Sequence, residues 1–196
     1  MSGATRNQVF GGPAAAFVVV AVAALLFPVA ASAAETELRP WQNGTAKTFT
    51  LPSTSGAEIA LAAQKSRVVL VHFFATWCEP CREELPALMR LIARARADDL
   101  AVVPLAVGEP AVRVQKFMSM TNVNFPVLLD EDRAVSKAWK IHALPSTVVL
   151  DNHLTPRLIV QSDFDWDRID LATLIAMTQE KPNHGKGRQK APPPAH

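Results

Sequence analysis

The strongest constraint on the fold is an apolar strand that leads directly into a pair of cysteines and then into a long helix. Residues 67–74 read RVVLVHFF, a nearly continuous apolar run rich in β-branched residues, which is typical of a strand covered on both faces of a parallel sheet. Cys78 and Cys81 follow, and they are the only cysteines in the chain. Two thiols at this spacing can form and break a disulfide without rearranging the fold. The sequence therefore predicts a redox-active pair at a strand-to-helix junction.

The helix after the cysteines is amphipathic. At 100° per residue, its apolar stripe contains Cys81, Leu85, Leu88, Ile92 and Ala95. Glu84 falls on the border of this stripe, one turn after Cys81, whereas Glu83 points outward. Pro80 fits the first turn, but Pro86 lies inside the helix and is expected to kink it. We therefore expect Glu84 to take part in the chemistry, with a plain surface carboxylate as the alternative.

Cys78 is the expected nucleophile of the pair. A sulfur in the first turn of a helix faces unpaired backbone N–H groups and the positive end of the helix dipole, and both favour the thiolate. Attack on a substrate disulfide would leave a mixed disulfide on Cys78, which Cys81, one turn deeper and less exposed, then resolves. Burial would raise the pKa of Glu84 toward the working pH, so that it could accept the Cys81 proton. Glu79 adds a negative charge beside Cys78, which favours a reducing protein.

Several of these residues also have plainer interpretations. The cysteines could form a purely structural disulfide, although closing so short a loop stabilises a fold by only about 2 kcal/mol. His72 shares a strand face with Leu70 and Phe74, where it is either a hydrogen-bonded core residue or a proton relay near Cys81. Trp77 is either ordinary packing or a recognition surface for protein substrates.

The segment from Phe73 to Pro86, FFATWCEPCREELP, resembles the active-site signature of the TlpA/ResA branch of the thioredoxin superfamily. The resemblance implies an α/β protein with a thioredoxin-like fold, in which a central mixed sheet is flanked by helices and carries the inserted strand and helix of this branch. It also implies a catalytic role for Glu84. The family's cis-proline, which lies beside the disulfide and pairs with substrate backbone, maps onto Pro145, after Leu144. His72 replaces the Asn or Asp often found in relatives, which puts proton transfer to Cys81 in question.

The resemblance extends, in order of elements, from about residue 49 to residue 177. Downstream of the active-site helix, we expect strands at 102–107 and 125–130, helices at 111–120 and 133–140, an antiparallel pair at 147–150 and 158–161 around a glycine-free turn, and a last helix at 166–179.

The two ends of the chain differ in composition from the part between them. Arg6 is the only charge before Glu35, and an apolar run at 14–27 precedes small residues at 31–34, which predicts a cleaved signal peptide over 1–34. An N-terminal membrane anchor is the alternative, because this stretch is about long enough to span a bilayer. We expect residues 35–181 to form a thioredoxin-like domain and 182–196 to be a disordered, basic, proline-rich tail.

These observations favour an exported enzyme, a thiol-disulfide oxidoreductase that reduces protein disulfides in the periplasm or on the extracytoplasmic face of the membrane. The family setting is cytochrome c maturation or copper-site assembly. A membrane electron-donor protein would re-reduce the pair, since an oxidising compartment supplies no small-thiol buffer. We expect a monomer without cofactor or bound metal.

Two other functions were weighed, and one partner class finds no support. A Cu(I)-binding metallochaperone could use the same two cysteines, although no sequence pattern places His142 or His153 as a third ligand. A thioredoxin-fold peroxidase is disfavoured because its Pro-x-x-x-Thr/Ser-x-x-Cys pattern is absent. Without the five basic residues of the two ends, 15 basic residues stand against 18 acidic ones, a net charge of about −3 that gives no support to nucleic-acid binding.

Overall fold

The computed structural model of the protein describes residues 37–121 and 123–179, which belong to one compact unit. The signal peptide or anchor expected at 1–34 and the tail expected at 182–196 lie outside the described residues. Within the described part of the chain, no helix has the length and apolar character needed to cross a membrane.

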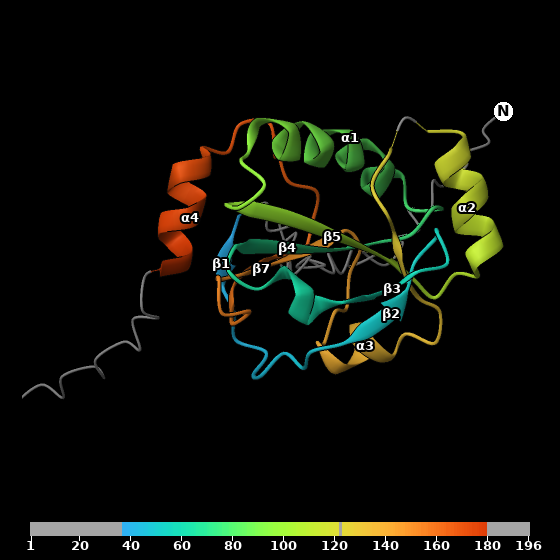
Figure 1. Cartoon of the computed structure of the whole chain (residues 1–196), viewed down its shortest axis with the longest axis horizontal. Helices are drawn as coiled ribbons and strands as arrows, with labels where there is room; N and C mark the ends of the chain where they lie inside the picture. Colours follow the sequence, from blue (N-terminus) through green and yellow to red (C-terminus); the bar gives the residue numbers. More distant parts are fainter. Residues whose placement is uncertain (1–36, 122, 180–196) are drawn as a thin grey trace, which may run out of the picture. The chain divides into compact units, whose positions relative to one another are not determined.

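A six-stranded mixed sheet forms the centre of this unit, with the spatial order β1-β8-β7-β4-β5-β6 (Figure 1). The strands are β1 (Arg39–Pro40), β4 (Val68–Phe74), β5 (Leu100–Val107), β6 (Leu128–Asp130), β7 (Ser146–Leu150) and β8 (Pro156–Val160). Strands β4, β5 and β6 are parallel, whereas β7, β8 and β1 continue the sheet by antiparallel pairing on the other side of β4. Every residue of β4 is buried, which confirms the strand predicted from its apolar run.

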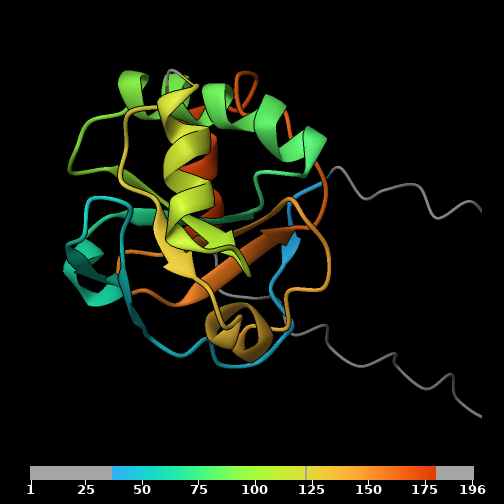
Figure 2. The same cartoon turned by 90° about the vertical axis from the view of Figure 1, so that its right-hand side faces the viewer.

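Helices cover both faces of the sheet. The active-site helix α1 (Glu79–Arg94) lies above the sheet in Figure 1, and α3 (Ala134–Ala138) lies below it. Helices α2 (Ala111–Ser119) and α4 (Leu171–Gln179) pack on the α1 face. The other face carries a short hairpin and a 3₁₀ turn beside α3, as Figure 2 shows: β2 (Thr50–Pro52), β3 (Glu58–Ala60) and η1 (Leu61–Gln64).

Alternation of side chains along β4 divides the core between the two faces. Phe73 packs with Trp139 on the α3 side, where the Trp139 indole also donates a hydrogen bond to the Lys47 carbonyl. On the opposite face, Leu70 packs beneath α1 and α4, and Phe74 packs beneath α1 and α2. Each such fully buried side chain contributes about 1.5–3 kcal/mol to folding. These contacts fix the end of β4, from which the active-site loop leaves the sheet.

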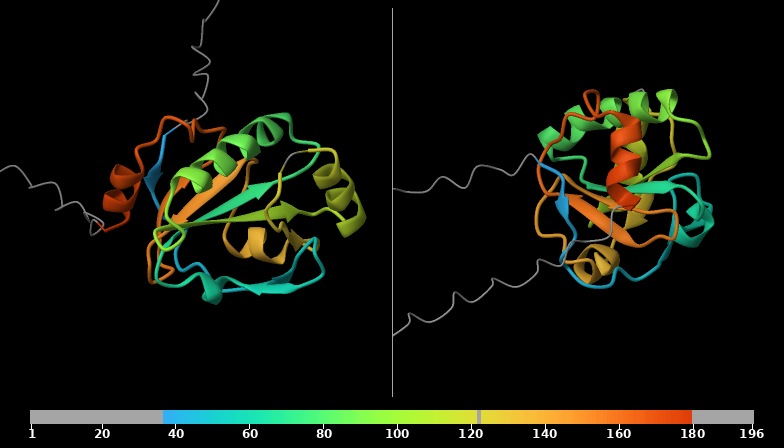
Figure 3. Two further views of the ribbon diagram at one scale, coloured as in Figure 1. Left: turned by 45° about the horizontal axis from the view of Figure 1, so that its top comes forward. Right: turned by 90° about the vertical axis from the view of Figure 1, so that its left-hand side faces the viewer.

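Helix α2 and strand β6 follow β5 in the chain and precede α3. Strand β6 pairs with β5 and is the third parallel strand, at one edge of the sheet (Figure 3, left panel). Together, α2 and β6 are the inserted helix and strand that the resemblance implies. β6 covers only the last three residues of the strand expected at 125–130, and α3 is shorter than the helix expected at 133–140. The carboxylate of Asp130 accepts the backbone N–H groups of Val135 and Ser136, which fixes the first turn of α3 directly after the strand.

The last helix begins later than the sequence predicted. We expected helix over 166–179, but α4 starts at Leu171. The side chain of Asp170 accepts hydrogen bonds from both the backbone N–H and the hydroxyl of Thr173, as a capping residue does. Trp166 instead lies in the preceding segment with its ring fully buried beneath α1. The apolar residues therefore begin before the helix does, because Trp166 belongs to the loop that precedes α4 and is buried there.

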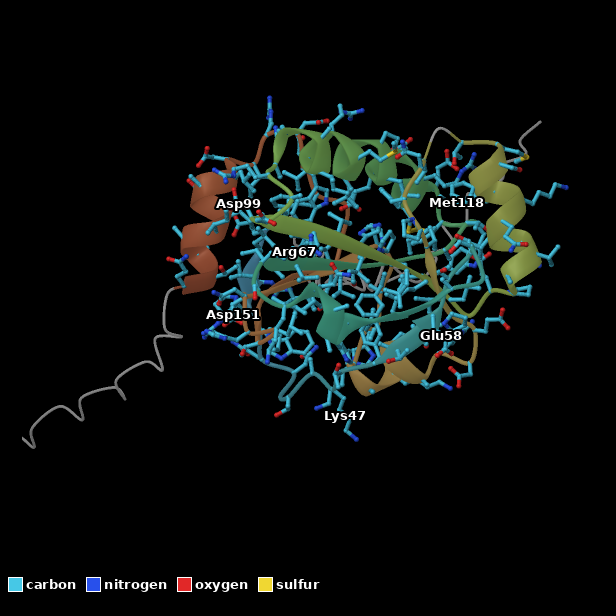
Figure 4. The ribbon with its side chains drawn as sticks, viewed as in Figure 1. Lys47, Glu58, Arg67, Asp99, Met118 and Asp151 are labelled. Atoms are coloured by element: carbon cyan, nitrogen blue, oxygen red, sulfur yellow. A yellow bond between two sulfur atoms is a disulfide. The ribbon has the colours of Figure 1, made fainter. Side chains whose placement is uncertain are left out.

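The hairpin between β7 and β8 turns without glycine, as its sequence predicted, and its register is set by Asp151. The Asp151 carboxylate accepts the backbone N–H groups of His153 and Thr155 and pairs with Arg157 at 2.8 Å. Leu154 takes the left-handed conformation, with φ of 64°, that a glycine usually provides. Asp151 is labelled in Figure 4. Its hydrogen bonds hold the turn in place of the backbone freedom that a glycine would provide.

Candidate active site

The cysteine pair lies where β4 ends and α1 begins. Figure 4 labels Arg67 and Asp99 at the end of the sheet where β4 and β5 start, and Met118 on α2 at the end where these strands stop. Cys78 is the N-cap residue of α1, and Pro80 stands in the first turn, where its missing N–H leaves no hydrogen bond unmade. Pro86 lies inside the helix, as expected.

Cys78 and Cys81 are joined in a disulfide with an S–S distance of 2.05 Å and a Cα–Cα distance of 5.3 Å. The inner residue, Cys81, is fully buried, in line with its expected role as the resolving sulfur. Cys78 is less open than we predicted, because only 6% of its surface is accessible in this oxidised form. It belongs to the apolar cluster between α1 and α2, on which Leu144 also packs. The small accessible part of Cys78 is therefore bordered by apolar residues, and we call it the opening at Cys78.

A buried glutamate that the sequence analysis missed holds the loop in front of Cys78. Glu109, just after β5, accepts the backbone N–H of Thr76 through one oxygen and the Thr76 hydroxyl through the other, each at 2.6 Å. Its side chain is only 1% exposed, and the nearest cation, Arg113, is 3.9 Å away. Charge-assisted hydrogen bonds of this kind are among the stronger ones in proteins. The two hydrogen bonds fix Thr76, which lies two positions before Cys78.

Glu84 is buried on the inner side of α1, with 5% of its surface accessible. Residues three apart on a helix are neighbours, so its carboxyl lies on the same side of α1 as Cys81. One oxygen accepts a hydrogen bond from the Trp166 indole, and the other accepts none from the residues that the structure describes. Burial raises the pKa of Glu84 to about 8; the Trp166 hydrogen bond opposes the rise, the charge of Asp163 adds to it, and the Phe164 backbone opposes it. Glu84 is thus poised to exchange a proton near neutral pH.

An acidic pocket borders Glu84 on the solvent side. We use this name for a hollow lined by five carboxylates, one cation and three other residues: Glu83, Glu84, Asp163, Asp165, Asp167, Arg90, Pro80, Ala87 and Phe164. Asp167 is bound by Arg90 through two hydrogen bonds of 2.8 and 2.7 Å, and these lower the pKa of the Asp167 carboxyl. Glu83 and Asp163 form no ion pair within the described residues. The pocket gives the proton on Glu84 a short route to solvent beside the active-site helix.

His72 is a core residue, and within the described part of the chain its Nε2 atom has no hydrogen-bond partner. The Nδ1 atom lies 3.0 Å from the hydroxyl of Thr147 on the neighbouring strand β7, and the ring stacks on Phe74 at 6.0 Å between centroids. Burial lowers the pKa of His72 to about 3, so the imidazole is neutral over the physiological range. The geometry matches the hydrogen-bonded core interpretation. A proton relay through the unpartnered Nε2 stays a hypothesis.

The remaining predicted residues surround the opening at Cys78. Leu144 and Pro145 are joined by a cis peptide bond, as the resemblance implied, and Pro145 is buried at the start of β7. Trp77 is 66% exposed, which removes the alternative that it is ordinary core packing. Glu79 forms an exposed ion pair with Arg82 at 3.0 Å. Exposed ion pairs contribute little to the stability of the fold. We therefore expect Glu79 to act mainly through the effect of its charge on the Cys78 sulfur.

The described residues offer no support for the copper-binding alternative. Within 37–121 and 123–179, no group of three or more His, Cys, Asp and Glu side chains is placed to hold a metal ion. Both sulfurs are engaged with each other, and neither His142 nor His153 joins them in such a group.

Comparison with known proteins agrees with this geometry. The family model described as AhpC/TSA matches residues 43–156, more than half of the chain. The chain belongs to the AhpC/TSA family. Among curated relatives, thiol-disulfide oxidoreductase ResA of Bacillus subtilis is 36% identical over 110 residues, which are 56% of this chain and 62% of that protein. Thioredoxin-like protein YneN of the same organism is 34% identical over 106 residues, 53% of this chain and 61% of that protein. The chain thus matches less than two thirds of the length of these family relatives.

Solved structures that resemble this chain have the thioredoxin-like fold that the sequence predicted. A thiol:disulfide interchange protein of the thioredoxin family from Chlorobium tepidum superposes with a TM-score of 0.57 at 25% identity, over 71% of this chain and 97% of that chain. StoA from Bacillus subtilis superposes with a TM-score of 0.56 at 20% identity, over 68% and 98% of the two chains. The mixed sheet flanked by helices is therefore a thioredoxin-like fold.

Proposed function

We propose that this protein is a thiol-disulfide oxidoreductase that reduces disulfides in other proteins through Cys78 and Cys81. The observation that supports this most directly is the closed disulfide at the start of α1, with the buried carboxyl of Glu84 one turn beyond the inner sulfur. A structural disulfide has no need of a carboxyl whose pKa is raised to about 8, whereas a resolving thiol needs a proton acceptor near that pH.

The reaction begins from the reduced pair. The Cys78 thiolate attacks one sulfur of the client disulfide, the client S–S bond breaks, and the client's other sulfur leaves as a thiolate that takes a proton from water. Cys81 then gives its proton to the Glu84 carboxylate and attacks the Cys78 sulfur. The mixed disulfide breaks, and the second client sulfur leaves as a thiolate. The client gains two electrons, and the protein is left with the Cys78–Cys81 disulfide.

Three surrounding groups support these steps. The Trp166 indole holds the Glu84 carboxyl in place, and the acidic pocket lets its proton pass to solvent. Glu109 fixes the loop that carries Trp77, whose exposed ring lies beside the opening for the client. Leu144 packs on the apolar cluster that contains Cys78, and client backbone would lie along Leu144 and the cis-proline Pro145.

The proposed setting is the periplasm or the extracytoplasmic face of the membrane, with export directed by residues 1–34. There the oxidised pair must be re-reduced by a dithiol of a membrane electron-donor protein, because such compartments do not maintain a reducing thiol pool. Cytochrome c maturation or copper-site assembly is the role that the TlpA/ResA resemblance suggests for the clients.

The direct test is to equilibrate the full chain with dithiothreitol or glutathione redox buffers and measure the fraction of the disulfide. We expect a reduction potential in the reducing range of thioredoxin-like proteins, near or below about −200 mV. A potential close to about −120 mV, that of a strong oxidant, would overturn the reductase assignment.

Trapping identifies clients and separates the two sulfurs. A Cys81→Ala variant should accumulate mixed disulfides with client proteins, because the resolving thiol is gone, while the matched Cys78→Ala variant should trap none at comparable rates. If both variants trapped equally, the assignment of Cys78 as nucleophile would be wrong.

A further inference from the structure

A second hollow, which we call the basic pocket, opens beside the cysteine pair on the side of α3. Its main lining residues are Trp77, Arg133, Lys137, Ile141, His142 and Leu144, and its volume is about 340 Å³. This volume has room for side chains rather than for a single water. Trp77 comes from the active-site loop, and Leu144 precedes the cis-proline, so the pocket adjoins the opening at Cys78.

The positive charges of the basic pocket form no ion pair with the described residues. Arg133 and Lys137 are exposed and form no ion pair among the described residues, and the Lys137 ammonium donates only to the backbone carbonyl of Asp132. Two carboxylates of the same segment hydrogen-bond to backbone N–H groups: Asp132 accepts that of Ala134, and Glu131 accepts that of Ala111. The pocket therefore presents two cationic side chains, without ion pairs among the described residues, beside apolar walls.

Gly108 leaves the space that the Arg133 side chain occupies. A Cβ atom built on Gly108, which has a φ of 68°, would lie 2.3 Å from Nε of Arg133. The guanidinium thus lies directly against the backbone at the end of β5. Gly108 is followed by Glu109, the residue that fixes the loop before Cys78. The adjacent residues Gly108 and Glu109 thus contact the Arg133 side chain and the active-site loop, respectively.

The other side of the cysteine pair has the opposite charge. The acidic pocket, defined above, reaches the CxxC segment at Pro80 and presents the carboxylates of Glu83 and Asp163, which form no ion pair among the described residues. The two pockets share no lining residue, and they approach the active-site segment from the α3 side and from the α1 side of the sheet. A client bound at Cys78 therefore meets positive charge on one side and negative charge on the other.

We propose that the basic pocket selects clients whose chain carries acidic side chains next to the disulfide, and that the acidic pocket fixes their direction by repelling that acidic flank. This inference rests on the proposed disulfide exchange at the same site and adds a substrate class to it. Carboxylates of the client would pair with Arg133 and Lys137, with apolar atoms against Trp77 and Leu144. Opposed charges of this kind act through both attraction and exclusion.

The test uses three synthetic peptides that each contain one disulfide and differ only in flanking residues: two Asp, two Lys or two Ser. Reduced full-length protein is mixed with each peptide, and the second-order rate constant of reduction is measured at low and at high salt. We expect the acidic peptide to react about tenfold faster than the basic one at low salt, with the ratio falling at 1 M salt, where charges are screened beyond about 3 Å.

An Arg133→Gln/Lys137→Gln double variant should bring the ratio of acidic to basic rates close to one. The matched control, Lys47→Gln/Lys116→Gln, removes two exposed lysines outside both pockets and should keep the wild-type ratio; circular dichroism checks that both variants fold. Equal rates for acidic and basic peptides with wild-type protein, or an unchanged ratio in the Arg133/Lys137 variant, would overturn the charge selection. Failure of the protein to reduce even the Ser peptide would instead overturn the proposed function.

Discussion

Replacing Glu84 with glutamine should change how the stability of the fold depends on pH. The pKa of Glu84 is about 8 in the folded protein, because burial disfavours the carboxylate, against an ordinary value of 4.5. Below pH 4.5, both the folded and the unfolded chain hold this proton. As pH rises from 4.5 to 8 the unfolded chain releases the proton first, so the free energy of unfolding falls across that window.

The size of the effect follows from the two pKa values. Between pH 4.5 and pH 7, the wild-type protein should lose about 3 kcal/mol of stability through this one group, at 2.303RT for each pH unit. The amide introduced by Glu84→Gln would not titrate, and its oxygen can still accept the Trp166 hydrogen bond. The stability of Glu84→Gln relative to wild type should therefore rise by about the same amount over this range.

The assay is urea unfolding of the oxidised full chain, at constant ionic strength and a series of pH values. Subtracting the wild-type curve from the variant curve removes the contribution of groups that titrate in both proteins, such as His72. Glu83→Gln is the matched control, since it removes the same charge from an exposed position one residue earlier. A difference curve for Glu84→Gln that stays flat from pH 4.5 to pH 8 would refute the argument that burial holds the proton on this carboxyl.

Three further substitutions test the surroundings of the site. Trp166→Phe removes the donor that favours the Glu84 carboxylate, so the pKa of Glu84 should rise further and closure of the Cys78–Cys81 disulfide at pH 7 should slow by about tenfold in stopped-flow mixing. Glu109→Gln removes an acceptor of the two Thr76 hydrogen bonds and a negative charge near Cys78, so we expect a loss of about 1–2 kcal/mol in urea unfolding and a less reducing potential by on the order of 20 mV in redox equilibration. The pKa of His72 is lowered to about 3, so wild-type stability should fall by about 2 kcal/mol between pH 7 and pH 5 relative to His72→Asn, as followed by acid and urea unfolding.

Each of these results has an outcome that would contradict it. An unchanged pH profile of disulfide closure in Trp166→Phe would separate Glu84 from the proton transfer. The control for Glu109→Gln is Glu58→Gln, which removes an exposed carboxylate that is labelled in Figure 4. Equal reduction potentials in the two variants would show that Glu109 does not influence the sulfurs. A His72→Asn variant as sensitive to acid as the wild type would show that the imidazole does not resist protonation in the folded state.

The sequence predicted the parts of the site that lie close together along the chain. The strand before Cys78 is fully buried and continuously apolar, and the helix after it has a clear apolar stripe, so both elements were readable from composition and period. Glu84 could be selected over Glu83 because helix geometry alone decides which side chain faces inward. The structure agrees, with Glu84 buried and Glu83 exposed.

The parts that could not be predicted depend on contacts between distant segments. Glu109 is 33 residues from Thr76, and Trp166 is 82 residues from Glu84, so no local pattern connects either pair. Trp166 was assigned to a helix because its apolar character fits the period, but tertiary packing holds it in a loop. The two- and three-residue strands β1, β2 and β3 carry too few side chains to give an alternating signal.

The hydrogen bond from the Trp166 indole to Glu84 also has a consequence for how such chains diverge. A carboxyl buried this deeply tolerates the loss of its donor poorly, and an indole N–H buried without an acceptor is costly as well. We therefore expect the two positions to be inherited together: homologues with another residue at position 166 should also have changed at position 84 or supply a substitute donor. Joint variation of these two sites across an alignment would record the pairing in evolutionary terms.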